Sequence, residues 1–266
     1  MRPTAHYLME TEAHVYALAV AASVLLAFYP FLMVMLSFCR DILHLPAAEQ
    51  AIYLAIRDFF AGKAGPFIVS NLQPWMVPKL HLLSMLLLLF TANGIFEPLE
   101  VALNRAWGVT ENRSYLKNQI ISLGLILGCG ALALLSLMLT ALNSGWIAQF
   151  AGPHSQILGF ISKGVFKLAA VPISMIALFL VYWLLPNRRI EPARVVPVAI
   201  WVGLALEGLK YLNMVLSPWL DDKFEHEYAI FRYSVTILLW SFLAALVVLA
   251  GAHWTARHGH EDPLSE

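Results

Sequence analysis

Long apolar stretches without charged residues dominate the pattern of this chain. Residues 13–39 form a run of 27 residues that contains no Asp, Glu, Lys or Arg, and residues 118–162 form a run of 45. An α-helix needs about 20 apolar residues to cross the hydrocarbon core of a bilayer. The first run therefore has room for one membrane-spanning helix and the second for at most two.

Six segments reach the length and hydrophobicity of a spanning helix, and polar or proline-containing segments separate them. We therefore predict an all-α integral membrane protein, a six-transmembrane-helix bundle that forms a single membrane domain over residues 1–266. The spans are expected at residues 14–38, 80–104, 120–142, 168–185, 195–216 and 233–255.

The longest stretch outside these spans is residues 40–79, between the first and second helices. Within it, Ile52 and Ile56 share a helical face, and Arg57 lies on another. This spacing predicts a short amphipathic helix over residues 49–60, in a segment that packs on the rim of the bundle or dips into the membrane interface. Glycines and prolines that follow are expected to break the chain: Gly62, Gly65, Pro66, Pro74 and Pro78.

Composition agrees with a membrane location. Apolar residues make up 60% of the chain, charged residues only 13%, and the mean hydropathy is +0.71, whereas about a quarter of a soluble domain is charged. The 17 basic and 17 acidic residues balance, so no nucleic-acid partner is predicted. Cys39 and Cys129 lie within or beside apolar runs without paired spacing, which favours small core residues over a disulfide or a metal site.

The orientation follows from the short loops, since the two sides carry nearly equal numbers of basic residues. The turn after residue 186 and the loop over residues 105–117 are short, basic and poor in acids, and such loops favour the cytoplasm. We predict that both termini are cytoplasmic. The first apolar run is expected to stay in the membrane as a helix, because it is too long for the core of a signal peptide.

A first polar stripe lies at the end of the second predicted span. Asn93, Glu97, Glu100 and Asn104 follow one another at spacings of 4, 3 and 4 residues, which places them on one helical face, and Arg105 comes next. Two interpretations are open. The helix has left the membrane and these residues are solvated, or they line a cavity within the bundle.

A second stripe lies on the fifth predicted span. Glu207, Lys210 and Asn213 are spaced by three residues, and the first two are placed to form an ion pair within the helix. The pair is either a self-neutralising structural feature or part of a site in which Lys210 or Arg105 receives an anionic group such as a phosphate. We also expect Lys210 to approach Glu97 or Glu100, so that both stripes share one cavity.

Other polar positions carry weaker signals. Pro30 is expected to kink the first span, and His253 in the sixth span is either a hydrogen-bonded structural residue or a proton-linked group. The acidic residues 221–227 are interpreted as a solvated loop beyond Pro218. We find no phosphate-binding loop, no nucleophile motif and no metal-ligand pattern, so no catalytic residue, metal or cofactor is predicted.

Several segments also resemble a known family. They occur in the chain in the order AASVLLAFYPFLMVMLS, ALNRAWGV, LLPNRR, WVGLALEGLKYL and YSVTILLWSFLAALVVLAGAHW. In order and spacing they are similar to the YihY/BrkB family of bacterial inner-membrane proteins, formerly labelled ribonuclease BN. The resemblance implies six spans, cytoplasmic termini, a bacterial cytoplasmic membrane and an envelope role that includes lipid export. His253 departs from the family, whose last helix often reads GAE.

Our functional hypothesis is a transporter or flippase-like protein that handles an amphiphilic, anionic envelope lipid. Glu97, Glu100, Asn104 and Arg105 would contact polar groups, and Lys210 would counter a phosphate. The partners expected are membrane lipids. The alternative is a non-enzymatic scaffold that binds an envelope protein through residues 40–79. A nuclease activity is not expected, because neither a basic surface nor a metal constellation is evident.

Overall fold

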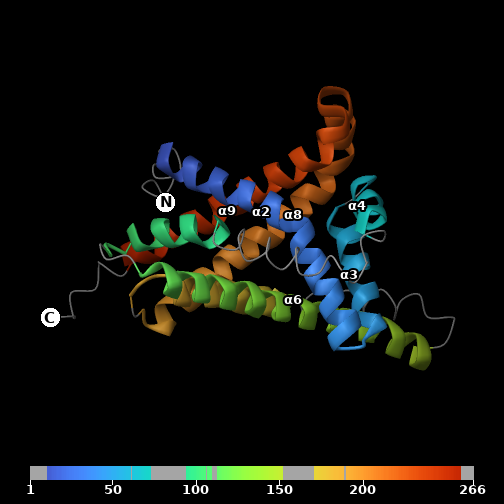
Figure 1. Cartoon of the computed structure of the whole chain (residues 1–266), viewed down its shortest axis with the longest axis horizontal. Helices are drawn as coiled ribbons and strands as arrows, with labels where there is room; N and C mark the ends of the chain where they lie inside the picture. The colour runs from blue at the N-terminus through green and yellow to red at the C-terminus, as the bar shows by residue number, and fades with distance from the viewer. Residues whose placement is uncertain are drawn as a thin grey trace.

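Figure 1 shows the protein as a computed structural model that describes residues 11–60, 62–72, 94–105, 107–109, 113–151, 171–188 and 190–258. Within these residues all regular secondary structure is helical. The helices, in chain order, are α2 (Thr11–Ser37), the π-helical turn η1 (Phe38–Ile42), α3 (Pro46–Phe59), α4 (Ala64–Leu72), a helix over residues 94–105, α6 (Tyr115–Ala151), a helix over residues 171–184, α8 (Pro192–Tyr228), the 3₁₀ turn η4 (Ala229–Phe231) and α9 (Arg232–His258).

Three helical stretches are long and apolar enough to cross a bilayer: Glu12–Ile42, Leu116–Ser136 and Pro192–Trp254. The third holds 63 residues, which is ~95 Å of helix and about three times the thickness of the hydrocarbon core. It consists of α8 and α9, joined by η4 into a hairpin (Figure 1). The prediction of an all-helical membrane protein is confirmed. The count of six spans stays a prediction, because residues 73–93 lie outside the described part.

Helices α2 and α9 pack against each other in opposite directions. Ala17 near the start of α2 belongs to one buried cluster with Leu249 near the end of α9. Leu36 near the end of α2 belongs to another, with Ile237 near the start of α9. Alanines at three successive turns of α2 are fully buried and allow the helices to approach closely: Ala13, Ala17 and Ala21.

The segment after α2 forms a short amphipathic layer, as predicted. Helix α3 begins with Pro46 in its first turn, where a missing backbone N–H costs nothing. Ile52 and Ile56 are buried in the same cluster as Leu36 of α2, while Arg57 is exposed. The chain turns at Gly62, whose φ of +74° favours glycine. The predicted break at Gly65 and Pro66 was wrong, because both lie in α4.

The largest error concerns the fifth span, which was expected to end near Pro218. Helix α8 instead continues to Tyr228, so the acidic residues 221–227 are helical and not a loop. Proline at 218 removes the N–H that would bond the Met214 carbonyl. Ser217 Oγ donates a hydrogen bond to that oxygen at 3.2 Å, so the helix passes the proline. Helix α6 likewise continues to Ala151, beyond the limit of residue 142 expected for the third span.

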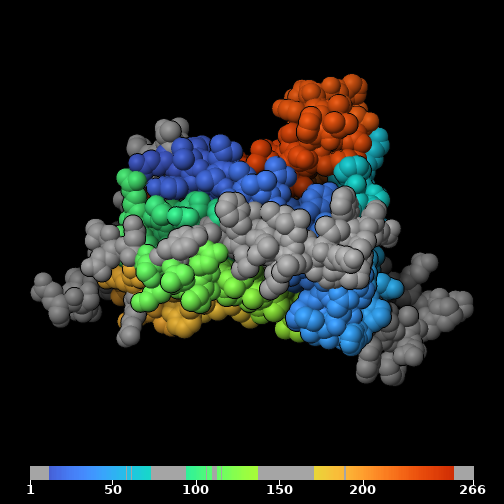
Figure 2. Space-filling model, in the orientation of Figure 1, coloured from blue at the N-terminus to red at the C-terminus, as the bar shows by residue number. Residues whose placement is uncertain are grey.

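The contacts define two ends of the molecule. Glu12, Arg105, Arg113 and the turn at residues 185–188 meet at one end, which is also where α9 finishes. We call it the terminal end. At the other end, α3 and α4 meet the hairpin end, defined here as Asp221–Arg232. The hairpin end projects beyond the rest of the molecule at the upper right of Figure 2.

Candidate functional site

The first predicted stripe forms a buried polar cluster at the terminal end. Glu100 and Asn104 are almost fully buried on the 94–105 helix. The side-chain amides of Asn104 and Asn118 donate hydrogen bonds to the Glu100 carboxylate, and the positive charge of Arg113 acts on it. Asn104 also accepts a 2.7 Å bond from the backbone N–H of Asn187. The cluster therefore joins the 94–105 helix to α6 and to the turn after the 171–184 helix.

Arg113 is the centre of this cluster. Its guanidinium donates to the carbonyls of Leu184, Leu185 and Pro186 at 3.1, 3.2 and 2.6 Å, and its Nε donates to Asn187 Oδ1 at 3.1 Å. Carbonyls at a helix C-terminus have no partner within the helix. Arg113 supplies those partners, so the cluster holds the fold together at the terminal end.

The rest of the first stripe does not share this cluster. Glu97 is exposed, and Arg105 forms an exposed ion pair with Glu12 at the start of α2. Asn93 lies outside the described residues. The structure thus divides the stripe into a buried pair, Glu100 and Asn104, and exposed residues beside it.

The second stripe lies on α8, and its ion pair forms as predicted. Lys210 Nζ is 3.5 Å from Glu207 Oε2, with the lysine side chain 42% exposed and the glutamate 24%. The expected approach of Lys210 to Glu97 or Glu100 is not found among the described residues. Glu100 is instead satisfied by Asn104, Asn118 and Arg113 at the terminal end, which leaves Lys210 with Glu207. That expectation was wrong.

The Glu207–Lys210 pair lies near the middle of the apolar part of α8. Arg194 and Asp221 are the nearest other charged residues along the helix, and the pair lies 13 residues after the first and 11 before the second. At 1.5 Å per residue these separations are ~20 and ~16 Å. The pair therefore lies close to the midpoint between Arg194 and Asp221 on the helix.

Large apolar side chains surround the pair on the surface of α8. Eight of them, between residues 200 and 219, are more than one-third exposed: Ile200, Trp201, Leu204, Tyr211, Leu212, Met214, Val215 and Trp219. Such a surface suits lipid chains, whereas ionisable groups at membrane depth cost about 3 kcal/mol or more each. An ion pair exposed on this surface is the least expected polar feature of the described residues, and we treat it as the candidate site.

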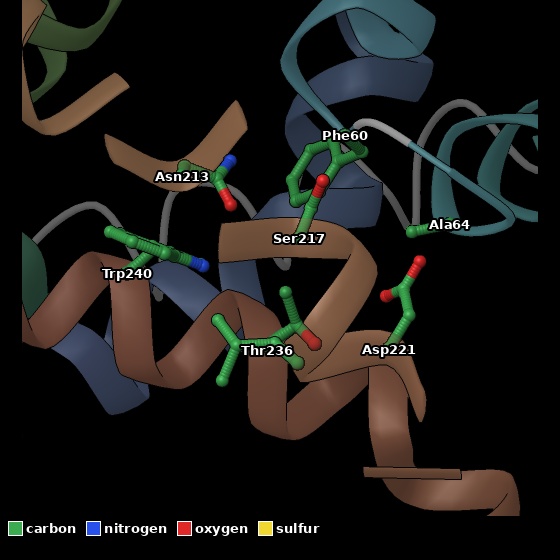
Figure 3. A pocket seen from close by; sticks show the side chains of 8 residues that line it. Phe60, Ala64, Asn213, Ser217, Asp221, Thr236 and Trp240 are labelled. Atoms are coloured by element: carbon green, nitrogen blue, oxygen red, sulfur yellow. The ribbon is translucent and has the colours of Figure 1, made fainter. Parts of the chain in front are cut away.

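Asn213, the third member of the stripe, faces a small cavity between the α3–α4 connection, α8 and α9 (Figure 3). Its Nδ2 donates a 2.9 Å hydrogen bond to the Phe59 carbonyl. The cavity has a volume of about 10 Å³. Its lining residues are Phe60, Ala64, Asn213, Ser217, Leu220, Asp221, Thr236 and Trp240.

Charged residues at the hairpin end connect α8 and α9 with the loop before α4. Glu225 pairs with Arg232 at 2.7 Å and with Lys63 at 3.2 Å, and the hydrogen bonds and charges of these two residues lower the pKa of the Glu225 carboxyl. Burial raises the pKa of the nearby Asp221, against the opposing effects of the Lys63 backbone N–H and the Arg232 charge.

Pro30 and His253 are the other positions that the sequence analysis singled out. Pro30 lies inside α2, which is α-helical on both sides of it, and its role as a kink stays a prediction. His253 is half-buried on α9, and a proton-linked role for it also stays a prediction. In the part of the chain that the structure describes, no group of three His, Cys, Asp or Glu side chains is placed to hold a metal ion.

Sequence reasoning missed the partners that lie far apart in the chain. Arg113 and Asn187 are 74 residues apart, and no local spacing relates them. The cavity residues Ser217 and Trp240 were overlooked because each lies in an apolar context. A hydroxyl one residue before Pro218 was the one available signal that α8 continues.

These features define a polytopic α-helical membrane protein with a polar cluster at one end and an exposed ion pair in the apolar part of α8. The family model described as "Virulence factor BrkB" matches residues 5–265, so the chain belongs to the BrkB family. The motifs ALNRAWGV and LLPNRR, on which the resemblance rests, meet in the structure through Asn104 and Asn187.

Individual relatives agree with this family. The chain is 28% identical to a UPF0761 membrane protein of Acinetobacter baylyi over 88% of its length and 55% of the relative's. It is 26% identical to one of Chromohalobacter salexigens over 91% of its length and 59% of the relative's. The chain thus spans little more than half the length of these curated relatives. No solved structure matches it.

Proposed function

We propose that the protein moves an anionic amphiphile, such as a phospholipid, across the bacterial cytoplasmic membrane without catalysing a chemical reaction. The Glu207–Lys210 pair would contact the headgroup while the acyl chains remain in lipid. The observation that carries this proposal is the exposed ion pair near the middle of the apolar part of α8. A headgroup that crosses the membrane must pass this depth.

The physical argument rests on the cost of exposing charge to lipid. A pair buried among helices would need no further partner, but Lys210 is 42% exposed on a surface of large apolar residues. A phosphate that reaches Lys210 gains a charge-assisted contact in a region of low dielectric. The same contact lowers the barrier that the headgroup meets in the hydrocarbon core.

The arrangement of charges supports cytoplasmic termini. The terminal end carries Arg105, Arg113, Arg188 and Arg194, and basic residues near short loops favour the cytoplasmic side. The hairpin end carries the acidic residues 221–227 and would lie on the opposite, periplasmic side. The scaffold alternative also has some support: one apolar face of α3 and α4 packs against α2, but Ile42, Leu54 and Phe67 stay exposed.

Headgroup contact predicts opposite effects for the two members of the pair. Replacing Lys210 by Met should reduce the association of spin-labelled phosphatidylglycerol with the reconstituted protein by about fivefold, since a contact of ~1 kcal/mol is lost. Glu207→Gln should increase it, because Lys210 then has no competing carboxylate. Electron paramagnetic resonance measures the lipid fraction immobilised by the protein, with phosphatidylcholine as the neutral comparison.

The same helix offers a matched control. Lys223 and Glu227 form an ion pair at 3.9 Å on α8, but at the hairpin end. Lys223→Met and Glu227→Gln should leave the preference for phosphatidylglycerol unchanged. The headgroup contact is refuted if Lys210→Met behaves like Lys223→Met, or if Glu207→Gln and Lys210→Met shift the preference in the same direction.

A further inference from the structure

The connection between α2 and α3, residues 38–45, carries more exposed apolar side chains than a loop in water needs. We call it the α2–α3 link. Its apolar side chains that are more than one-third exposed are Phe38, Ile42, Leu43 and Leu45. Single exposed apolar residues are ordinary on a protein surface, but several close together indicate contact with lipid or with a partner.

The length of the first span places the link in the membrane interface. The helical stretch Glu12–Ile42 has 31 residues, which is ~46 Å at 1.5 Å per residue. A bilayer with both headgroup regions is about 40–45 Å thick. Glu12 forms an exposed ion pair with Arg105 at the terminal end. A helix that begins among the headgroups at Glu12 therefore reaches the opposite headgroup region at Ile42.

The backbone of the link is largely satisfied without water. The N–H of Leu43 donates to the Phe38 carbonyl and the N–H of Leu45 to the Cys39 carbonyl, both at 3.0 Å. The first of these bonds closes the π-helical turn η1. Backbone groups without partners are costly next to hydrocarbon, so this link can approach lipid more closely than an open loop.

The charges of the link also suit the interface. Arg40 Nε lies 3.0 Å from Asp41 Oδ1, and the two side chains are 34% and 46% exposed. Charges near a bilayer are tolerated when they pair with one another. Because the pair leaves the link without net charge, apolar contact would drive its binding, rather than attraction to anionic lipids.

A turn at His44 keeps the chain at this depth. His44 has a φ of +51°, which is uncommon outside glycine, and its Nδ1 lies 3.0 Å from the Arg40 carbonyl oxygen. After this turn the chain enters α3, whose Ile52 and Ile56 are buried in one cluster with Leu36 of α2. The chain therefore returns to the rim of the bundle directly after the link.

We propose that the α2–α3 link is a lipid anchor, in which Ile42, Leu43 and Leu45 insert into the leaflet at the hairpin end and hold α3 and α4 at the rim of the bundle. Lipid is favoured over an envelope protein, because the link continues the exposed apolar side of α2, which includes Leu18 and Leu26. The anchor goes beyond the proposed function, since it requires no lipid to cross the membrane.

Spin labels at single cysteines measure the depth of the link in lipid nanodiscs. The two cysteines of the chain, Cys39 and Cys129, are first replaced by alanine. Ile42→Cys then reports on the link. Val215→Cys is the lipid reference, because Val215 is 75% exposed on the apolar part of α8. Glu227→Cys is the water reference, because Glu227 is exposed at the hairpin end.

We expect oxygen, which concentrates in lipid, to relax the labels at positions 42 and 215 several-fold more than a water-soluble nickel complex does. The order should reverse at position 227. A label at position 42 that the nickel complex relaxes as strongly as the label at position 227 overturns the anchor, because the link then lies in water. A label that neither reagent reaches also overturns it, because protein then covers the link.

A second measurement needs no substitution. Phosphatidylcholine with a photoreactive group on its acyl chain is added to nanodiscs of the unaltered protein, and mass spectrometry locates the cross-links. We expect cross-links within residues 42–45 and none within residues 221–227. Cross-links on α8 near Val215 without any in residues 42–45 would also overturn the anchor, and the proposed lipid movement would remain to be judged by its own experiments.

Discussion

Replacing Arg113 by Met should destabilise the protein by about 3 kcal/mol or more, because several charge-assisted hydrogen bonds of about 1.5–3 kcal/mol each are lost. The substitution deprives three carbonyls at the end of the 171–184 helix of their donor. It also leaves the buried Glu100 carboxylate without the positive charge that acts on it. The apolar methionine matches the length of the arginine stem, so the loss is mainly one of hydrogen bonds and charge.

Thermal unfolding of the purified protein in detergent measures this effect, and a midpoint lowered by roughly 10 °C or more is expected for a chain of this size. Arg105→Met is the matched control. The Arg105 side chain is 62% exposed and pairs with Glu12 at the surface, where an ion pair contributes at most about 1 kcal/mol. Equal midpoints for the two variants would contradict the role of Arg113.

Gly251→Ala should have the second-largest effect. A Cβ at Gly251 would overlap Val202 Cγ2 and come within 2.7 Å of the Tyr182 hydroxyl. That hydroxyl is buried and donates a 2.7 Å hydrogen bond to the Val248 carbonyl. One methyl group would thus push α8 from α9 and disturb this bond, and overpacking of this kind costs about 1–3 kcal/mol.

The control for this substitution lies on α6. A Cβ at Gly124 would meet no atom within 4 Å, so Gly124→Ala should be neutral or stabilise the helix by up to about 1 kcal/mol. The unfolding midpoint should therefore fall for Gly251→Ala and stay equal or rise for Gly124→Ala. A Gly251→Ala variant as stable as the wild type would show that α8 and α9 do not approach as closely as the structure indicates.

The membrane-spanning helices at the two ends of the described chain could be predicted closely from sequence. The spans expected at residues 14–38 and 233–255 correspond to α2 and α9, which begin and end within a few residues of these limits. Lipid exposure demands a continuous apolar run of fixed length, and this demand is local in the sequence. The amphipathic α3 was predictable for a similar reason.

Helix ends that depend on one hydrogen bond were not predictable. Pro218 and the charges after it are typical of a loop, yet Ser217 satisfies the carbonyl that the proline leaves free. The Lys223–Glu227 pair then supports the extra turns. Propensity alone favoured a break, whereas the structure has a continuous helix in which the Ser217 hydroxyl bonds the Met214 carbonyl.

The polar residues of the candidate site could also be predicted only in part. The Glu207–Lys210 pair follows from a spacing of three residues within one helix, so the sequence was sufficient to place it. Two partners of Glu100 are Asn118 on α6 and Arg113 just before α6. The partner expected from the sequence, Lys210, pairs with Glu207 on α8 instead. Apolar packing decides which helix ends meet, and no spacing of polar residues encodes that choice.

Movement of a labelled lipid by the reconstituted protein tests the central claim most directly. Vesicles with fluorescent phosphatidylglycerol in both leaflets are treated with dithionite, which bleaches only the outer leaflet unless lipids cross. The proposal predicts that nearly all of the fluorescent lipid is bleached in vesicles that contain the wild type. Lys210→Met should lower the rate of bleaching of the inner-leaflet lipid at least fivefold, whereas Lys223→Met should leave this rate unchanged. Bleaching that stops at half of the label, as in protein-free vesicles, would contradict the proposal, and so would equal rates for the two lysine variants.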